Sequence, residues 1–236
     1  MNEKLNYEFF DEMMKDASPE ERDNHAKKFE EIMMWYGCAI REVRTKLEVL
    51  NDEFQATRNR NPIETIKSRI KKPMSIFEKM GRRGYPVTMD AMLTEMHDIA
   101  GVRVICPFID DIYEIADMLT AQDDIKVLQR KDYIKYPKPN GYRSLHLVVE
   151  VPIFLSNEKK PMKVEVQIRT IAMDFWASLE HQIHYKKFDQ GRDDIVERLT
   201  LCANVIYATD VEMQELRKEL LLFENQDNDN GDGFEE

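Results

Sequence analysis

The segment 162–169, MKVEVQIR, restricts the fold more than any other part of the chain, because its residues alternate strictly between apolar and polar. A period of two predicts a β-strand with one face in a core and the other face open. The apolar face would be Met162, Val164, Val166 and Ile168, and the polar face Lys163, Glu165, Gln167 and Arg169. Such an ordered set of charged and amide groups on an open strand face indicates a site that holds a polar ligand.

A second polar segment, KPNGYRSLH at 138–146, stands one predicted hairpin before the first. Its Asn-Gly pair predicts a tight turn, because glycine accepts backbone angles that other residues avoid. Tyr142 follows the turn and could offer an exposed ring to a nucleotide base, a contact that contributes about 1–3 kcal/mol per base in single-strand binders. The same ring could instead plug the edge of a sheet. His146 is expected on the strand face that points away from the apolar side.

The rest of the chain mixes periods of two and of about 3.6 residues, which predicts one α+β domain with a mixed sheet and long helices at both ends. Ser18 and Ser75 each precede a Glu by three positions, a capping box that predicts a helix start. Thr170 is expected to cap another helix. Strands are expected over 66–70, 99–106, 125–134, 144–155 and 162–169, and further helices over 1–16, 19–58, 88–96, 110–121 and 193–224.

Charge is distributed unevenly along this acidic chain, whose formal net charge is −11. The stretch 67–83 holds seven basic residues and one acid, and a second basic stretch covers 130–143. Two cationic stretches in an acidic protein indicate a localised site for a polyanion. A solvated basic face would have the same composition, so charge alone leaves both interpretations open.

The cysteines and the apolar runs indicate the cellular compartment in which the protein is expected. Cys38, Cys106 and Cys202 are widely spaced and odd in number, which fits neither a metal site nor a disulfide framework. Buried thiols in a reducing cytoplasm are the expected state. No apolar run reaches the length of a membrane span, and the mixed, acidic N-terminus is not expected to be a signal peptide.

Two acids, Asp98 and Glu165, occupy positions that indicate catalysis. Asp98 begins a predicted strand, and Glu165 lies in the middle of the polar strand face. Carboxylates at such places can converge on a divalent cation, and hard oxygen ligands suit Mg²⁺. The alternatives are that Asp98 is only a turn residue and that Glu165 forms an ion pair with Lys163 or Arg169.

Basic residues upstream of these acids could hold a polyphosphate. Arg69 and Lys71 are two apart on an extended stretch and therefore share a face. Ser75 is expected to start a helix whose free amide groups favour a phosphate, and Lys79 follows one turn later on the same side. Arg82 lies in a glycine-flanked loop. The chain contains neither a Walker sequence nor a dinucleotide fingerprint, so a nucleotide would be held without a glycine-rich loop.

Four motifs, in this order and spacing, resemble the synthetase domain of the RelA/SpoT alarmone enzymes: SRIKKPMSIFEK, HDIAGVRVIC, YIKYPKPNGYRSLHLVV and VEVQIRTIAMDFWASLEH. The resemblance covers about residues 60–187. It implies a nucleotidyltransferase-like mixed sheet flanked by helices. It leaves no room for the hydrolase and regulatory domains of the long enzymes. The chain therefore resembles a small alarmone synthetase, of the class that forms homotetramers through its terminal helices.

The resemblance also implies a reaction. The family transfers the β,γ-diphosphate of ATP to the 3′-hydroxyl of GDP or GTP, which gives AMP and ppGpp or pppGpp. By resemblance, Asp98 binds Mg²⁺, Glu165 is a metal ligand or the base, and Arg69 and Arg103 sandwich adenine. The other implied contacts are Lys71, Ser75, Lys79 and Arg82 with the ATP phosphates, and Lys138, Asn140, Tyr142, His146 and Gln167 with GDP or GTP.

These expectations divide the chain into N-terminal helices (1–60), a catalytic domain (61–190), a C-terminal helix (191–224) and a disordered acidic tail (225–236). The preference between GDP and GTP stays open, because the KPNGY turn is more similar to that of the long enzymes. Binding of an alarmone or RNA at a regulatory site also stays open. The alternative function is a catalytically silent nucleotide- or RNA-binding module. Retention of both Asp98 and Glu165 argues against it, because a pure anion binder gains nothing from two acids.

Overall fold

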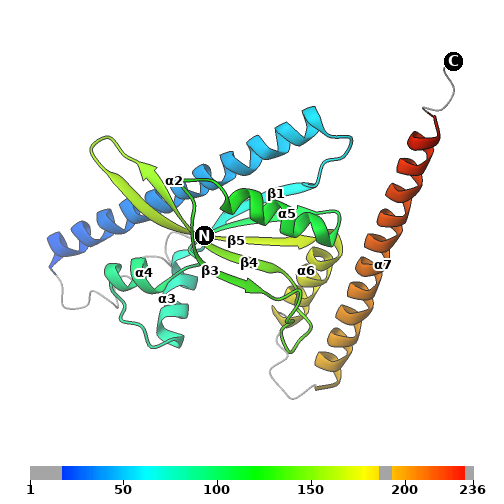
Figure 1. The fold of residues 1–236 in the computed structure, drawn as a ribbon. Coiled ribbons are helices and arrows are strands. Elements are labelled where there is room, and N and C mark those ends of the chain that lie inside the picture. The colour runs from blue at the N-terminus through cyan, green and yellow to red at the C-terminus, as the bar shows by residue number, and fades with distance from the viewer. Residues whose placement is uncertain (1–17, 186–192, 232–236) are drawn as a thin grey trace.

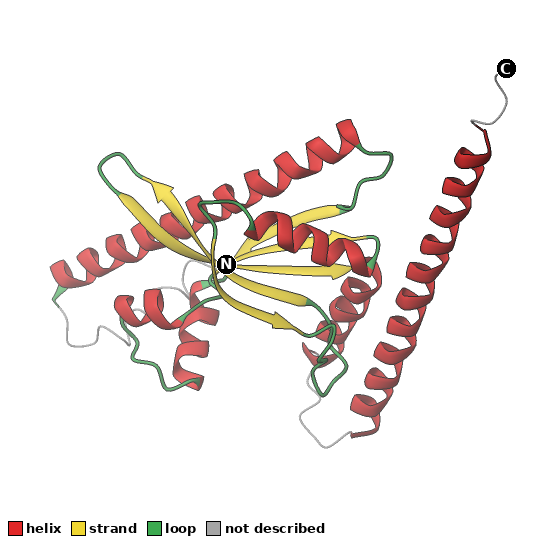
Figure 2. Cartoon of the chain, viewed as in Figure 1, coloured by secondary structure: helices red, strands yellow, loops and turns green. Residues whose placement is uncertain are grey.

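The computed structural model describes residues 18–185 and 193–231 (Figure 1). The predicted helix over 1–16 lies outside the described residues. Helices and strands alternate through the central part of the chain, between two long helices (Figure 2). The helices are α2 (Pro19–Thr57), α3 (Pro73–Arg82), α4 (Met89–Glu95), α5 (Ile109–Thr120), α6 (Ile171–Tyr185) and α7 (Asp193–Gly231), and the strands are β1 (Thr65–Ile70), β2 (Ala100–Cys106), β3 (Lys126–Asp132), β4 (Leu145–Phe154) and β5 (Lys159–Thr170).

The strands form one mixed sheet in the order β1-β2-β5-β4-β3. β2 and β5 run parallel, and the other neighbouring strands run antiparallel. Each predicted strand is confirmed, and β5 begins earlier than expected, at Lys159. The predicted two-faced character of β5 is also confirmed, because Val164, Val166 and Ile168 are fully buried whereas Lys163, Glu165 and Gln167 are partly open. Arg169, the last residue of the predicted polar face, is buried instead.

The apolar face of the sheet packs against α2 and α5. Ile32, Val43 and Leu47 of α2 and Ile112 of α5 are completely buried in the same core as the inward residues of the strands. Each such side chain stabilises the fold by about 1.5–3 kcal/mol relative to the exposed state. The opposite, polar face is left for α3, α4 and α6, which lie below the sheet along its margins.

The helix starts follow the predicted capping signals with one exception. Ser18 and Glu21 form the expected capping box of α2, and the Thr170 hydroxyl accepts from the Met173 N–H at the start of α6. Ser75, however, is not a cap: α3 begins at Pro73, and Ser75 lies inside its first turn. Proline is favoured at the first helical position because its φ is already helical and its missing N–H needs no partner there. This preference moves the helix start ahead of Ser75.

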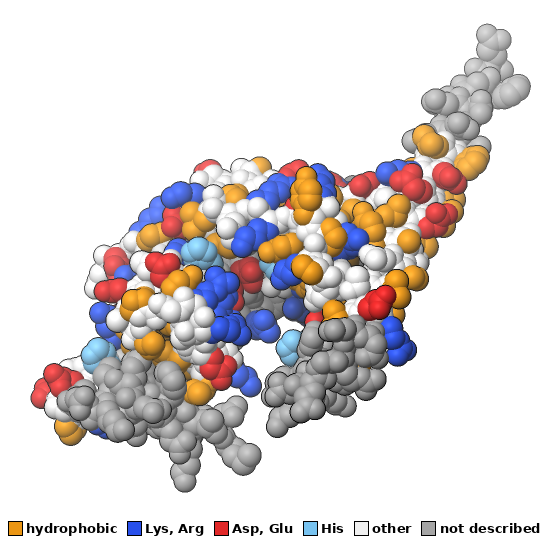
Figure 3. All heavy atoms as spheres, turned by 90° about the horizontal axis from the view of Figure 1, so that it is seen from below, with side chains coloured by type: hydrophobic (Ala, Val, Ile, Leu, Met, Phe, Trp, Pro, Cys, Tyr) orange, Lys and Arg blue, Asp and Glu red, His pale blue; other side chains and the backbone are white. Residues whose placement is uncertain are grey.

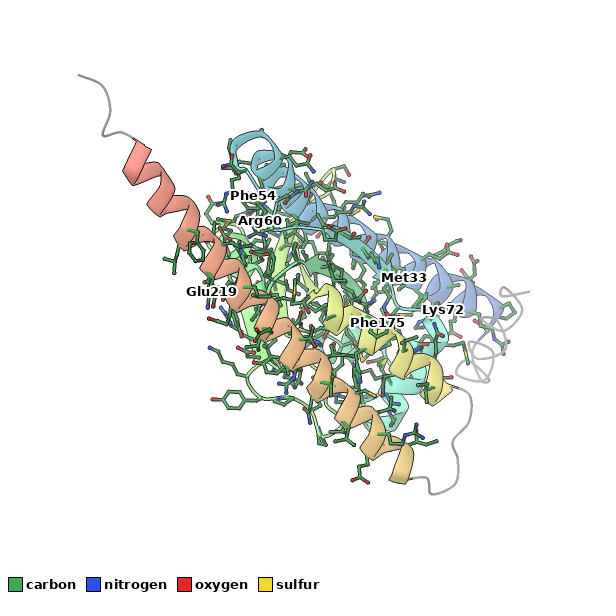
Figure 4. All side chains as sticks on the ribbon, turned by 90° about the vertical axis from the view of Figure 1, so that its right-hand side faces the viewer. Met33, Phe54, Arg60, Lys72, Phe175 and Glu219 are labelled. Atoms are coloured by element: carbon green, nitrogen blue, oxygen red, sulfur yellow. The ribbon has the colours of Figure 1, made fainter. Side chains whose placement is uncertain are left out.

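The long helix α7 lies beside α6 and projects beyond the body at its C-terminal end (Figure 4). The predicted disorder of the acidic tail stays a prediction. The helix itself continues to Gly231, past its predicted end at 224. The reason is that no proline interrupts this segment, and Asn, Asp and Gln each cost at most about 0.7 kcal/mol relative to Ala in a helix. None of the helices in the described part of the chain is both long and apolar enough to cross a membrane.

Candidate active site

The floor of the candidate site is the polar face of the sheet. Strand pairing places Lys67, Arg103, Gln167, His146 and Lys131 in one row across the five strands. The same pairing places Arg69, Gly101, Glu165, Val148 and Gln129 in the neighbouring row. Gly101 has no side chain, so it leaves space between Arg69 and Glu165. The predicted polar face of one strand is therefore part of a polar surface that spans the sheet.

Helices and a loop raise walls around this floor and form a cleft of about 850 Å³. The walls come from α3, the end of α4, α6 and the segment 133–144 between β3 and β4, which we call the acceptor loop. Figure 3 shows this hollow from below, with Lys and Arg side chains along its walls and acidic side chains deeper inside. The volume is in the range of small-molecule sites.

Asp98 lies between α4 and β2, at the end of the cleft nearest α3. The Nζ atoms of Lys71 and Lys79 each lie 2.7 Å from its Oδ2. Burial alone would raise the pKa of the Asp98 carboxyl, but the hydrogen bonds and charges of both lysines outweigh burial, so the pKa lies below its ordinary value. The other oxygen, Oδ1, is buried and has no hydrogen-bond partner among the described residues. Asp98 is thus ionised and keeps one oxygen available to a ligand.

Glu165 stands at the end of a hydrogen-bonded chain of side chains. Arg169 Nη2 lies 2.9 Å from Tyr142 Oη, Tyr142 Oη lies 2.8 Å from His146 Nε2, and His146 Nδ1 lies 3.3 Å from Glu165 Oε1. A consistent set of donors follows: the guanidinium donates to the phenol oxygen, the phenol donates to Nε2, and Nδ1–H donates to the carboxylate. This series of hydrogen bonds orients the Glu165 carboxylate and leaves its negative charge in place.

The Glu165 carboxyl is also acidic despite its position. Burial raises its pKa, but the hydrogen bonds from His146 and Gln167 lower it by more, so the net pKa is below the ordinary value. Neither Lys163 nor Arg169 forms the ion pair with Glu165 that sequence left open. Lys163 Nζ donates instead to the backbone carbonyls of Leu93 and Thr94, at 3.2 and 2.6 Å.

The carboxylates of Asp98 and Glu165 both line the cleft. No group of three or more Asp, Glu, His or Cys side chains capable of holding a metal occurs within the described ranges. Mg²⁺ characteristically needs only one or two carboxylates and takes its remaining oxygens from water and phosphate. The unpartnered Oδ1 of Asp98 and the Glu165 carboxylate in the same cleft fit that requirement.

On the side nearest Asp98, the structure brings some of the expected cations together and leaves others out. Arg69, Lys79 and Arg103 line the cleft. Lys71 contributes through its ion pair with Asp98. Ser75 and Arg82 do not line the cleft, and Arg83 does so in place of Arg82. Arg82 is the last residue of α3 and Arg83 is its C-cap. Consecutive residues point in different directions around a helix axis, so only Arg83 is directed into the cleft.

On the opposite side, the acceptor loop brings Lys138, Asn140 and Tyr142 to the cleft together with His146 and Gln167. Tyr142 is not the freely exposed ring that the sequence suggests. Its hydroxyl is anchored by Arg169 and His146, and the Lys138 ammonium lies 4.6 Å from its ring centre. The same ammonium lies 4.8 Å from the ring centre of Tyr133. A base that stacks on this side would meet a cation held between two tyrosine rings.

Several residues that line the cleft were given no role from the sequence. The sequence patterns that could have identified them differ in strength. Arg169 was visible on the polar strand face, but its burial and its bond to Tyr142 depend on the fold. Lys131 could have been found from the period-two register of β3 relative to His146. Tyr133 lies inside the strand predicted over 125–134, but β3 ends at Asp132, so the predicted period does not apply to its side chain.

Comparison with known proteins identifies the family. A model described as the region found in RelA/SpoT proteins matches residues 68–190. The chain belongs to the RelA/SpoT family. The resemblance expected from the four motifs is therefore confirmed.

Individual members of the RelA/SpoT family align over most of their length. The GTP pyrophosphokinase YwaC of Bacillus subtilis is 43% identical over 188 residues, which are 80% of this chain and 90% of that protein. The crystal structure of small alarmone synthetase 1 from Bacillus subtilis bound to its product pppGpp is 37% identical, with a TM-score of 0.76 over 82% of this chain and 98% of that one. The same synthetase bound to AMPCPP gives a TM-score of 0.70 at 33% identity, over 83% and 98%. These structures also confirm the predicted α+β fold.

Proposed function

We propose that this protein is a small alarmone synthetase that transfers the β,γ-diphosphate of ATP to the 3′-hydroxyl of GDP or GTP. The observation that carries the proposal is the position of Glu165 and Asp98 in one cleft, between two separate groups of cations. Its family members include GTP pyrophosphokinases, and solved relatives are bound to pppGpp and to AMPCPP. One cleft with two cationic ends suits a reaction between two nucleotides.

The cations make the encounter of two polyanions possible. Phosphoryl transfer depends chiefly on positioning and on charge stabilisation, because there is little covalent chemistry for the protein to perform. At the donor end, Lys79, Arg83 and the Lys71–Asp98 pair would hold the ATP phosphates, and Arg69 and Arg103 would enclose adenine. Ser75 and Arg82 receive no support from the geometry. At the acceptor end, Lys138 would hold phosphate, while Asn140, Tyr142, His146 and Gln167 would surround guanine and its ribose.

Asp98 and Glu165 would hold Mg²⁺ between the two ends. When bound, Mg²⁺ would offset the charge of the donor phosphates. The fit rests on the available Oδ1 of Asp98 and on the ionised state that the lowered pKa of each carboxyl indicates.

Glu165 is the candidate base. As the acceptor 3′-oxygen forms a bond to the β-phosphorus of ATP, the bond from that phosphorus to the α,β-bridging oxygen breaks and AMP leaves. Glu165 would accept the hydroxyl proton while His146 Nδ1–H holds the carboxylate in place. A carboxylate of low pKa is a weak base, so the surrounding cations must acidify the hydroxyl.

The test is to mix the protein with ATP, GDP and Mg²⁺ and to separate the products by anion-exchange chromatography. Formation of AMP and ppGpp in equal amounts is expected. Absence of AMP at every Mg²⁺ concentration would contradict the proposal. Release of diphosphate instead would indicate nucleotidyl transfer, and nucleotide binding without product, insensitive to Mg²⁺, would indicate a silent binding module.

The outward face of α7 supports assembly into a homo-oligomer, a tetramer by family resemblance. Leu201, Val205 and Leu220 are 57, 67 and 64% exposed, although such side chains normally face a core. The inward face of the same helix is largely polar, with Asp210, Gln214 and Arg217 bonded to the body. A second copy of the chain would cover the outward face. Light scattering should give a multiple of the 28.0 kDa chain mass, and a monomer would refute assembly. The proposed location is the cytoplasm, where ATP and GDP or GTP would be available as substrates.

A further inference from the structure

The acceptor loop rests on α7 as well as on the sheet. Its turn is closed by the Gly141 N–H, which donates to the Lys138 carbonyl at 2.8 Å, and by the Tyr142 N–H, which donates to Asn140 Oδ1 at 3.2 Å. Gly141 has a φ of +87°, which favours glycine. The turn therefore has a defined shape and presents Lys138, Asn140 and Tyr142 to the cleft.

Gly141 fits against α7 with no space for a side chain. A Cβ atom at this position would lie 2.5 Å from the Ala203 Cβ and 3.5 Å from the Thr200 Cα. The void among Gly141, Trp176, Ala203 and Tyr207 is only about 10 Å³. Because the contact is this close, a shift of α7 toward or away from the body would act directly on the turn.

Tyr207, about one helical turn after Ala203 on α7, makes a second contact with the acceptor loop. Its ring lies 3.8 Å from the Arg143 guanidinium carbon. Arg143 Nη1 donates to the Ile134 carbonyl at 2.8 Å, which ties together the two ends of the acceptor loop. Arg143 Nε is buried and has no hydrogen-bond partner among the described residues. The tyrosine ring is therefore a major stabilising contact of this cation.

The inward face of α7 is fixed to the body at other points as well. Trp176 Nε1 donates to the Leu199 carbonyl at 3.0 Å, and the Thr170 hydroxyl bonds to Asp210. Gln214 Nε2 donates to Asp110 Oδ2 at 2.8 Å. These bonds hold the helix in register, so that Ala203 and Tyr207 form a firm support beneath the acceptor loop.

We infer that Ala203 and Tyr207 are positioning residues that set the affinity for the acceptor nucleotide through Gly141 and Arg143. They do not line the cleft and act only by holding the loop that carries Lys138, Asn140 and Tyr142. The inference rests on the proposed assignment of this loop to GDP or GTP. It assigns α7 a role in substrate binding in addition to its outward apolar face.

The test uses the full-length chain and the variant Tyr207→Ala. The KM for GDP at saturating ATP should rise about tenfold, equivalent to about 1.4 kcal/mol, while the KM for ATP at saturating GDP stays unchanged. Tyr207→Phe keeps the ring and should retain the wild-type KM for GDP. Equal rises in both KM values, an unchanged KM for GDP, or a Phe variant that behaves like the Ala variant would overturn the inference.

A second pair of variants covers the case in which Tyr207→Ala fails to fold. Ala203→Leu adds bulk against Gly141, and Ala208→Leu adds the same bulk on the exposed side of the same helix. The first should raise the KM for GDP and the second should leave it unchanged, with thermal unfolding and molar mass measured for both. Equal KM values for GDP in the two variants would contradict the inference.

The variant Tyr142→Ala distinguishes failure of the inference about α7 from failure of the proposed assignment of the acceptor loop to GDP or GTP, on which the inference rests. A selective rise in the KM for GDP in Tyr142→Ala, with no rise in Tyr207→Ala, would refute the role of α7 and leave the acceptor assignment intact. Equal changes in both KM values for Tyr142→Ala would refute the acceptor assignment itself, and with it the inference.

Discussion

Replacing Tyr142 by Phe should weaken both the fold and the catalytic step while it leaves the ring in place. The lost hydroxyl joins Arg169 to His146, and through His146 to Glu165. Arg169 is only 2% exposed, so water cannot readily replace the acceptor that its Nη2 would lose. Its other partners are Gln167 Oε1 at 2.7 Å and Asp174 Oδ1 at 3.4 Å.

The size of the effect follows from these contacts. A hydrogen bond to a charged group contributes about 1.5–3 kcal/mol, and one between neutral groups about 0.5–1.5 kcal/mol. The second bond, to His146, is partly replaced by water because the His146 side chain is 13% exposed. The free energy of unfolding should therefore fall by about 2–3 kcal/mol. The rate constant kcat should fall as well, because His146 no longer holds Glu165 in one orientation.

Urea denaturation would measure the stability change, and steady-state kinetics would measure kcat and the KM for GDP. Because phenylalanine preserves the stacking surface, the KM for GDP should change little, in contrast to Tyr142→Ala. An unchanged unfolding midpoint together with an unchanged kcat would refute the reasoning, since it would mean that the chain from Arg169 to Glu165 has no energetic weight.

The remaining predictions concern the two carboxylates. Glu165→Gln should lower kcat by about 10²–10⁴-fold, the usual contribution of a general base, while calorimetry still detects binding of ATP and GDP; a wild-type rate would exclude Glu165 as the base. Asp98→Asn should lower the free energy of unfolding at neutral pH by about 1–3 kcal/mol, because Lys71 and Lys79 lose a charged acceptor. Since the pKa of Asp98 is lowered on folding, its stabilisation is present above the ordinary pKa of 3.8 and is lost as the pH falls through the folded value. The stability difference between wild type and Asp98→Asn should therefore shrink in acid; a constant difference would contradict the lowered pKa.

The candidate site was predictable as far as its residues belong to regular strands. The alternation around Glu165 fixes which side chains share a face, because the period of a strand is a local property of the chain. The capping signals at Ser18 and Thr170 were reliable for the same reason. Ser75 was misleading because a stronger local signal, Pro73, stands two residues before it. Where a strand ends earlier than predicted, as β3 does before Tyr133, the period no longer assigns the side chain a direction.

The polar face of β5, the turn before β4 and the residue types of a two-nucleotide site could all be predicted from local sequence patterns. The fold was needed to show that β5 lies between β2 and β4, which brings Glu165 into the same cleft as Asp98. It was also needed to show that Arg169 is buried against Tyr142, and that Gly141 packs on Ala203 of α7. The period of a strand shows which of its side chains share a face, but it does not show which strand lies next to it. The order of the strands depends on how segments far apart in the chain bury their apolar surface together.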